Sequence, residues 1–241
     1  MKHDIVRRQV RLKETFATVI AAECHQDLAG QSIAASRSAI EAYIARCPEF
    51  RTALQPLAVE AGAPAIIRRM AAAAARAGVG PMAAVAGAIA QETVEALVAA
   101  GAAHAIVDNG GDVVLFIDRP ATIGIFTGPA RIRDIALRFV PRPGIFSVCT
   151  SSGTVGHSLS FGRADAAIVI AGDGYLADAM ATALGNRIRS GSENEIESAI
   201  RESLLEGVEG LLVVASDYLG VGGELPEIVR TPVGAQLVSQ G

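Results

Sequence analysis

Aromatic residues are scarce in this sequence. It contains no tryptophan, and all aromatic residues together occupy 4% of its 241 positions. Proteins that bind bases by stacking use aromatic side chains as platforms, and so few rings provide no obvious platform of that kind. A ligand is therefore expected to be held by backbone amides, hydroxyl groups and charge.

Cysteine is scarce as well. Cys24, Cys47 and Cys149 are odd in number and unrelated in spacing, so they predict neither a disulfide framework nor a zinc-binding pattern. Unpaired thiols are typical of a reducing compartment. No hydrophobic segment follows the basic residues at the N-terminus, so no secretory signal is expected. Both observations favour the cytoplasm.

The sequence also lacks an excess of positive charge and long hydrophobic runs. The net charge is −4, with one basic cluster at Arg7, Arg8, Arg11 and Lys13, which argues against nucleic acid as the main partner. Hydrophobic residues make up 51% of the chain and the mean hydropathy is +0.38. Charged residues, glycine and proline nevertheless interrupt the most apolar region, so no run reaches the about 20 residues of a membrane span.

The hydrophobic pattern predicts mainly helices first and mainly strands after them. Helices are predicted over residues 27–46, 65–77, 82–100, 175–184 and 193–205, and strands within residues 6–23 and over residues 104–107, 113–116, 122–126, 135–139, 145–148, 166–171, 211–215 and 225–229. This order indicates an α+β fold with antiparallel or mixed sheets packed against alanine-rich helices. No repeat or linker divides the chain, so residues 1–241 are predicted to form a single domain.

Residues 144–186 contain most of the side chains capable of chemistry. A short apolar strand leads into a polar loop rich in glycine and hydroxyl groups, and a buried strand and an alanine-rich helix follow. Gly185 and Asn186 are predicted to end that helix. Long polar loops between buried elements usually carry functional residues, so a binding or catalytic site is expected here.

Asp178 and Thr182 are spaced i and i+4 in the last helix of this stretch, so both lie on one face. A carboxylate, a hydroxyl and nearby carbonyl oxygens are ligands that suit Mg²⁺. The same spacing fits an ordinary amphipathic helix in which the threonine hydroxyl bonds to its own backbone. Spacing alone leaves both interpretations open.

Asn109, Gly110, Gly111 and Asp112 lie between two predicted strands. Paired glycines allow positive φ and a close approach of the backbone to a ligand, and the flanking side chains can hydrogen-bond a nucleobase or ring edge. Asn-Gly is also among the strongest signals for a hairpin turn. The motif is therefore a candidate binding loop or a hairpin.

A hydroxyl-rich loop is predicted after the strand at residues 145–148, and it comprises Thr150, Ser151, Ser152 and Gly153. Such loops offer amides and hydroxyls to phosphate. His157 and Asp165 are candidates for an acid/base pair, although a structural histidine fits as well. Cys149 is interpreted as a buried core thiol, with a nucleophilic role as the alternative.

In this order the motifs resemble the ApbE superfamily of flavin transferases. The stretches that carry the resemblance are VGPMAAVAGAIA (residues 79–90), NGGDV (109–113), CTSSGTVGHSLSFGRADA (149–166) and LADAMATALGN (176–186). They are most similar to a shorter, cytoplasmic ApbE-like family of archaea and bacteria, whose members are mostly uncharacterised. The resemblance extends over most of the chain.

The resemblance implies a T-fold-like ApbE-type domain that binds FAD and Mg²⁺, cleaves the pyrophosphate and attaches FMN to a threonine of an acceptor protein. The metal ligands of that family map onto Asp178 and Thr182, with a backbone carbonyl from near Val85. The flavin-nucleotide-binding elements map onto Asn109, Gly110, Gly111, Asp112, Thr150, Ser151, Ser152, Gly153 and His157. His157 and Asp178 are the catalytic candidates.

Three departures distinguish the chain from ApbE enzymes. Their AKGYAVD-like helix start is replaced by VAGAIAQ (residues 85–91), which has neither the lysine nor the aspartate. Their DPxTG-like turn is replaced by SLSF (158–161), and their M-G-T element by ETF (14–16). The lipoprotein signal common in that family is missing too. By this resemblance, the residues that bind the metal are retained, whereas the residues that bind FAD are replaced.

Three functions are compatible with these observations. The first is a cytoplasmic, Mg²⁺-dependent enzyme acting on a flavin or other nucleotide pyrophosphate, such as an FAD:protein FMN transferase. The second is a non-catalytic flavin- or metabolite-binding accessory protein in redox or sulfur metabolism. The third is a different enzyme, in sulfur transfer, that uses Cys149 and His157. Small-residue packing over residues 82–100 and the exposed terminal strands also lead us to expect a homodimer.

Overall fold

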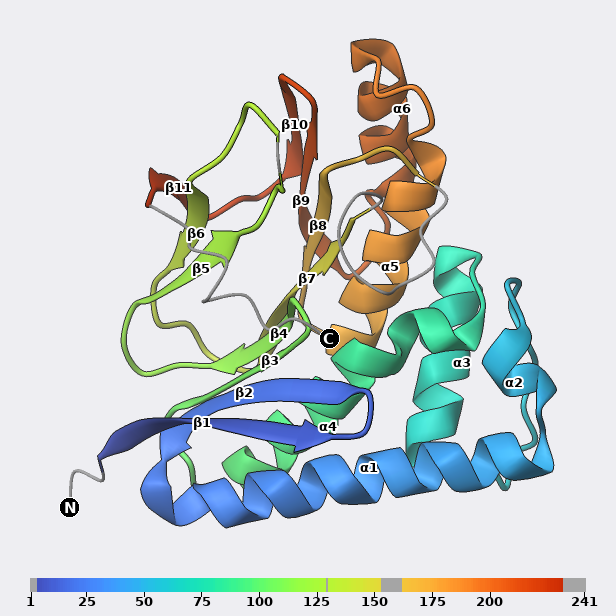
Figure 1. The fold of residues 1–241 in the computed structure, drawn as a ribbon, viewed down its shortest axis with the longest axis vertical. Helices are drawn as coiled ribbons and strands as arrows, with labels where there is room; N and C mark the ends of the chain where they lie inside the picture. The colour runs from blue at the N-terminus through green and yellow to red at the C-terminus, as the bar shows by residue number, and fades with distance from the viewer. Residues whose placement is uncertain (1–3, 129, 153–161, 232–241) are drawn as a thin grey trace.

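The computed structural model describes residues 4–128, 130–152 and 162–231 (Figure 1). The chain begins with an antiparallel hairpin of β1 (Ile5–Leu12) and β2 (Thr15–Ala22), and Lys13 in its turn has a φ of 52°. A helical segment follows, which consists of η1 (Glu23–His25), α1 (Gln26–Arg46), α2 (Glu49–Thr52), α3 (Ala65–Ala77), η2 (Pro81–Ala84) and α4 (Val85–Ala99).

Strands dominate the rest of the chain. They are β3 (Ala105–Asn109), β4 (Asp112–Phe116), β5 (Ala121–Ile125), β6 (Ile135–Phe139), β7 (Phe146–Ser151), β8 (Ala166–Ala171), β9 (Val208–Ala215), β10 (Tyr218–Gly223) and β11 (Glu227–Arg230). Two helices, α5 (Gly174–Arg187) and α6 (Glu193–Ser203), lie between β8 and β9.

The strands form two sheets. Eight strands pair in the order β1-β2-β3-β4-β7-β8-β9-β10, and β11, β6 and β5 form a second sheet. Every pairing among the described strands is antiparallel. The predicted α+β class with antiparallel sheets is therefore confirmed.

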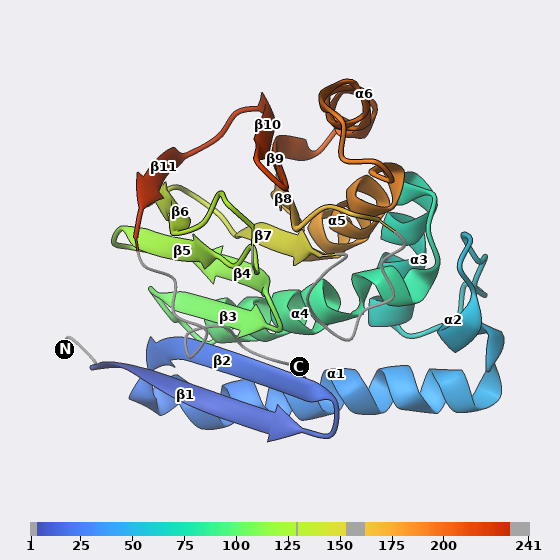
Figure 2. The ribbon, with the colours of Figure 1, turned by 45° about the horizontal axis from the view of Figure 1, so that its top comes forward.

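The large sheet is the middle layer of the fold, between helices and the small sheet (Figures 1 and 2). Side chains alternate across a strand, so Val107, Val114 and Val169 pack against the helices. Their neighbours Ile106 and Leu115 face the small sheet instead. The two faces of the large sheet therefore present different side chains to the two neighbouring layers.

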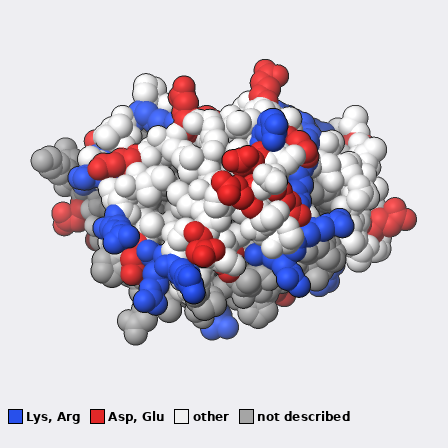
Figure 3. All heavy atoms as spheres, turned by 90° about the horizontal axis from the view of Figure 1, so that it is seen from above, with Lys and Arg blue, Asp and Glu red and all other residues white. Residues whose placement is uncertain are grey.

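Charged side chains are mixed by sign on the surface shown in Figure 3, where acidic and basic groups lie next to one another. Ion pairs among the described residues also combine the two signs, such as the exposed pair Arg8–Asp27 and the half-buried pair Arg142–Glu209. A nucleic-acid interface shows clustered basic side chains instead. The face in Figure 3 does not have that character.

Some predicted elements match the structure residue for residue, namely those over residues 65–77, 135–139 and 166–171. The predicted helix end at Gly185 and Asn186 is wrong, because α5 continues to Arg187. Gly162 packs against the backbone there: a Cβ on Gly162 would lie 1.9 Å from the carbonyl oxygen of Gly185. The glycine at 185 lies within the helix and does not stop it.

Strand β10 is not evident from the hydrophobic pattern, since its sequence is YLGVGG. Its glycines allow α6 to lie directly on the sheet. A Cβ on Gly220 would be 2.6 Å from Ile196 Cγ2, and one on Gly222 would be 2.4 Å from Ile200 Cγ2. Packing with a helix, rather than strand propensity, accounts for this sequence.

The helix predicted over residues 82–100 starts with the short 3₁₀ helix η2 and becomes α-helical at Val85. By length and hydropathy alone Pro81–Ala99 is able to cross a membrane, but half of that stretch is buried against other elements, as in a core helix. Ala88 and Ala90 are fully buried inside the chain. Because its small residues make intrachain contacts, they no longer argue for a homodimer.

Gly87 is the point of closest approach between α4 and α5. A Cβ on Gly87 would lie 2.2 Å from the carbonyl oxygen of Gly174 and 2.8 Å from Cβ of Asp178. Overpacking of this kind costs about 1–3 kcal/mol. We expect Gly87→Ala to lower the free energy of unfolding by that amount in urea titrations.

Gly30→Ala is the matched control, because Gly30 lies inside helix α1 and an added Cβ there meets nothing within 4 Å. Alanine is favoured over glycine in a helix interior by about 0.5–1 kcal/mol, so this variant should be more stable than the native protein. Equal stability changes in the two variants would contradict the close contact at Gly87.

Candidate functional site

A cavity of about 1680 Å³ opens where β3, β4 and β7 approach the beginning of α4 and one side of α5. Asp178 and Thr182 both line it, one helical turn apart, as their spacing predicted. Asp178 is 8% exposed and Thr182 is half-buried. The cavity is larger than most ligand pockets, which measure about 300–1000 Å³.

Helix α5 is positioned by its first residues. The side chain of Asp173 accepts hydrogen bonds from the amides of Tyr175 (2.8 Å) and Leu176 (3.4 Å), which is the N-cap arrangement. This cap fixes where the helix starts. The side chain of Asp178 consequently points toward the start of α4.

Helices α4 and α5 cap one another at the cavity. No side chain of its own N-cap residue serves α4, but the amide of Gly87 donates to Asp178 Oδ2 at 2.8 Å. In return, Gln91 of α4 accepts a hydrogen bond of 3.0 Å from the amide of Gly174, at the start of α5. Each helix thus satisfies an amide that the other leaves free.

Asp112 is the second buried acid at this point. It is 8% exposed, and its Oδ1 accepts a hydrogen bond of 3.3 Å from the amide of Thr150. Burial, and then the negative charge of Asp178, raise the pKa of Asp112 well above its ordinary value. The two carboxyl groups therefore lie near enough to oppose each other's ionisation.

Asp178 is similarly perturbed. Burial raises its pKa to about 7, although the amides of Gly87 and Ala86 donate to the carboxylate and lower the pKa. No cationic side chain of the described residues is close enough to lower the pKa of Asp178 further. Two buried acids without a cationic partner are stabilised by a bound cation or by a proton.

The donor set at this point suits a hard cation. No group of three or more His, Cys, Asp or Glu side chains that could bind a metal occurs among the described residues, so a soft transition-metal cluster is not formed there. Carboxylates, the Thr182 hydroxyl and water would instead suit Mg²⁺, which binds oxygen and keeps several waters. The predicted ligands Asp178 and Thr182 are placed consistently with that prediction.

The motif at residues 109–112 is a hairpin turn between β3 and β4, and it lines the cavity as well. Gly110 and Gly111 have the expected positive φ angles, 70° and 101°. The side-chain amide of Asn109 donates to the carbonyl oxygen of Ala86 at 3.1 Å, next to the predicted carbonyl ligand near Val85. Asn109 therefore fixes the first turn of α4 against the sheet.

The hydroxyl-rich segment differs from the prediction. Cys149, Thr150 and Ser151 continue strand β7, because they pair with Val169, Ile168 and Ala167 of β8. Thr150 is part of the ladder and its amide donates to Asp112, so it is not part of a free phosphate loop. Thr150, Ser151 and Ser152 still line the cavity with their side chains or backbone.

Three predictions for residues around this segment have different outcomes. Gly153 and His157 lie outside the described residues, so their roles stay predictions. Asp165, the suggested acid/base partner, is 9% exposed and its Oδ2 accepts a hydrogen bond of 2.7 Å from the amide of Ser216. Asp165 therefore holds the turn between β9 and β10.

Cys149 is fully buried beside the acid pair. Burial raises the pKa of its thiol, and the negative charges of Asp112 and Asp178 raise it further. Because the thiolate is the reactive form of cysteine, this thiol is held in its unreactive state. The interpretation as a buried core thiol is supported by these surroundings.

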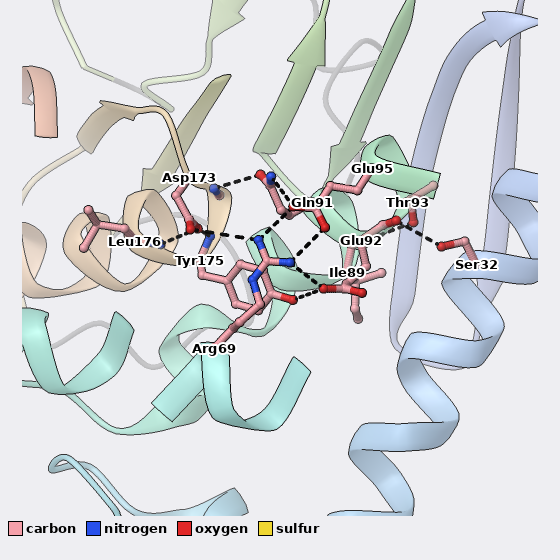
Figure 4. A network of polar contacts seen from close by, with 11 residues as sticks. Ser32, Arg69, Ile89, Gln91, Glu92, Thr93, Glu95, Asp173, Tyr175 and Leu176 are labelled. Atoms are coloured by element: carbon pink, nitrogen blue, oxygen red, sulfur yellow. Dashed lines mark hydrogen bonds and ion pairs between the residues drawn. The ribbon is translucent and has the colours of Figure 1, made fainter. Parts of the chain in front are cut away.

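A polar network behind the site joins α3, α4 and α5 (Figure 4). Arg69 of α3 binds Glu92 and Glu95 of α4 at 2.8 Å each, and its guanidinium lies 4.2 Å from the ring centre of Tyr175. The Tyr175 hydroxyl donates to Glu92, and Gln91 donates to Glu95. This network braces the contact between α4 and α5 from the side away from the cavity.

This network is not evident from the sequence. Gln91, Glu92, Thr93 and Glu95 interrupt an otherwise apolar helix, and this polar group is the sign of the network that the sequence contains. Their partners Arg69 and Tyr175 lie far away in sequence, in other helices. Only the packing of three helices brings them together.

The chain matches known proteins over most of its length. The family described as AbpE bacteria matches residues 3–206. A UPF0280 protein of Methanosarcina barkeri is 42% identical, over 98% of this chain and 93% of its own length. A UPF0280 protein of Methanocella arvoryzae is 46% identical, over 96% of this chain and 94% of its own length.

Solved structures share the fold at much lower identity. The ApbE protein of Thermotoga maritima superposes with a TM-score of 0.56 at 13% identity, covering 99% of this chain and 100% of that one. The apo flavinyl transferase ApbE of Pseudomonas stutzeri gives 0.54 at 13% identity, covering 91% and 94%. The fold is therefore that of ApbE, and the chain belongs to the AbpE bacteria family.

Proposed function

We propose that this protein binds FAD together with Mg²⁺ at the buried acid pair and transfers FMN to a threonine of an acceptor protein. The observation that carries the proposal is the pair of Asp112 and Asp178, two buried acids with raised pKa values on one cavity. Such a pair favours a bound cation, and pyrophosphate chemistry uses one.

The chain's own residues have separate tasks in this proposal. Asp178 and Thr182 hold the cation, and Asp112 adds negative charge beside it. The turn at residues 109–112 and the end of β7 line the same cavity, so the phosphates would lie beside them. Bound Mg²⁺ supplies neutralisation of the charge that develops on a cleaving pyrophosphate.

The proposed transfer breaks one bond between phosphorus and oxygen and forms another. The acceptor threonine oxygen forms a bond to the phosphorus of the FMN half of FAD, and the bond to the bridging oxygen breaks. AMP leaves with that oxygen, and the proton of the threonine hydroxyl is released. The products are a protein-bound phosphoester of FMN, AMP and one proton, so atoms and charge balance.

Two structural neighbours support the flavin half of the proposal by their names, since they are described as a flavin transferase and a flavinyl transferase. We propose FAD or FMN as the bound flavin for the same reason. The free cysteines Cys24, Cys47 and Cys149 are consistent with the cytoplasm, which we retain as the proposed location.

A non-catalytic flavin- or metabolite-binding role is the second candidate. The observation that favours it is the use of Gln91, in the stretch that replaces the AKGYAVD-like helix start of ApbE enzymes. Its side chain binds Gly174 and Glu95 and does not line the cavity. Binding of FAD with Mg²⁺ but without release of AMP would distinguish this role from transfer.

Asp178→Asn tests the metal site. The variant keeps an oxygen that can accept from Gly87 but removes the charge that a cation needs. We expect Mg²⁺ to strengthen FAD binding to the native protein in isothermal titration calorimetry, and this gain to fall by about tenfold or more, about the loss of one charged contact.

Asp173→Asn is the matched control on the same helix. Asp173 does not line the cavity, and asparagine is an equally good N-cap, so its Mg²⁺-dependent FAD binding should equal that of the native protein. Identical FAD binding by Asp178→Asn and Asp173→Asn would contradict the proposed metal site.

The raised pKa of Asp178 predicts a pH dependence of stability without metal. A carboxyl group with a pKa of about 7 when folded and 3.8 ordinarily binds more protons in the folded state between those values. Its stabilising contribution is complete below the lower value and is lost as the pH rises through the higher one. In EDTA, the free energy of unfolding should fall by about 2 kcal/mol between about pH 5 and pH 8.

Asp178→Asn should show a smaller decrease over the same range, since it has no proton to lose at 178. Addition of Mg²⁺ at the higher pH should restore stability to the native protein and not to the variant. A pH dependence that is identical in both proteins would show that ionisation of Asp178 does not cause it.

The buried thiol predicts the pattern of alkylation. At mildly alkaline pH, iodoacetamide should modify Cys24, which is exposed, and leave Cys149 unmodified until denaturant is added. Peptide mass spectrometry of the native and unfolded protein measures this directly. Rapid modification of Cys149 in the folded protein would revive the sulfur-transfer hypothesis.

A further inference from the structure

We propose that His104 and Arg119, at the other end of the same cavity, bind the imide edge of the flavin ring, and that Asp118 orients both side chains. This inference rests on the proposed function and specifies how the ring is oriented. An imide edge is a ring N–H between two carbonyl groups, so it offers one donor beside acceptors. The site is built from residues that neither the motifs nor the resemblance single out.

His104 and Asp118 are neighbours because of the β3–β4 hairpin. Ala105 pairs with Phe116 in this hairpin, so the residues just outside that pair lie close together. His104 Nδ1 is 3.0 Å from Asp118 Oδ1, and the histidine side chain is 6% exposed. The other ring nitrogen has no hydrogen bond to the described residues, and His104 lines the cavity.

The carboxylate determines which histidine nitrogen carries the proton. Hydrogen bonding to Arg119, the main effect, and to His104 lowers the pKa of Asp118 to about 2, so it is ionised at neutral pH. An ionised carboxylate accepts only, and Nδ1 of His104 therefore donates to it. Nε2 is then the unprotonated nitrogen of a neutral ring, and it can accept a hydrogen bond from a ligand N–H.

Arg119 supplies donors beside that acceptor. Its Nε and Nη2 bind Asp118 at 2.8 and 3.1 Å, and Arg119 lines the cavity together with His104. Nη1 takes no part in these two bonds and is free to donate to a carbonyl oxygen. An acceptor and a donor side by side match a ring N–H next to a carbonyl group.

The walls between the two ends of the cavity are apolar and suit a flat ring. Ile20 of β2, Ile106 of β3 and Val113 of β4 come from the large sheet, and Ile123 and Ile125 of β5 come from the small sheet. Both sets line the same cavity. Apolar side chains from the two sheets can contact the faces of a planar aromatic ring.

The two polar ends are separated by the length of β3. His104 precedes this strand and Asn109 ends it, a distance of about 16 Å at about 3.3 Å per residue. A ligand that uses both ends must carry its phosphate away from its ring. A flavin nucleotide does so, because the ribityl chain separates the ring from the phosphate.

The test compares riboflavin with 3-methylriboflavin, in which a methyl group replaces the imide hydrogen. Fluorescence titration of the native protein should show about tenfold weaker binding of the methylated ring, as expected for loss of a buried hydrogen bond and insertion of a methyl group. His104→Ala should bind riboflavin more weakly and should no longer discriminate between the two ligands.

Two further variants separate recognition from folding. Asp118→Asn alters the carboxylate that orients His104 and lies at a partly exposed position, 41% exposed, so it should fold and discriminate less than the native protein. His25→Ala removes a histidine that does not line the cavity and should retain the tenfold discrimination. Equal discrimination in the native protein, His104→Ala and Asp118→Asn would overturn the inference.

The outcome for FAD distinguishes this inference from the function on which it rests. Mg²⁺-dependent FAD binding with no discrimination against 3-methylriboflavin would overturn the ring orientation and leave the proposed function intact. Failure to bind either FAD or riboflavin would overturn both.

Discussion

The hydrogen bond from the amide of Gly87 to Asp178 is the interaction on which the site depends. It lets a side chain of α5 cap α4, and Gln91 of α4 accepts from the first amide of α5 in return. The two helix starts can meet so closely only because both contacts involve glycine, Gly87 and Gly174. The position of Asp178 is therefore a consequence of helix packing and not of a flexible loop.

This arrangement has an electrostatic cost. It buries Asp178 near Asp112, and the raised pKa values of both acids show that the folded protein disfavours their ionisation. A strained charge distribution of this kind is common at functional sites. Braced from behind by Arg69, Glu92 and Tyr175, the helices keep the acids together even without a cation.

The two ends of the cavity differ in character. The carboxyl groups of Asp112 and Asp178 lie beside the turn between β3 and β4. His104, Asp118 and Arg119 lie at the opposite end of the same strands. Apolar residues from both sheets line the space between them. Because side chains alternate along each strand, one sheet both packs against the helices and forms the wall of the cavity.

The sequence was sufficient to predict the α+β class, most elements and the shared face of Asp178 and Thr182. Those features depend on local periodicity and on short motifs such as Asn109–Asp112 and the LADAMATALGN helix. The motif at 109–112 is a hairpin turn that also lines the cavity; the hairpin interpretation is confirmed, and the binding role stays a prediction.

Features that depend on distant partners could not be predicted. Strand β10 is rich in glycine because α6 lies on it, and Gly185 lies inside a helix against Gly162. Thr150 joins a ladder with β8 instead of a loop. The pairing of Asp112 with Asp178, and of His104 with Asp118, likewise requires the sheet to be assembled first.

A crystal structure of the protein grown with Mn²⁺ tests the proposed metal site most directly, because Mn²⁺ replaces Mg²⁺ at oxygen sites and gives an anomalous signal. We expect an anomalous peak within ligand distance of Asp178 and Thr182 and close to Asp112. A crystal with FAD bound in the cavity and no anomalous peak beside Asp178 would contradict the proposed metal site.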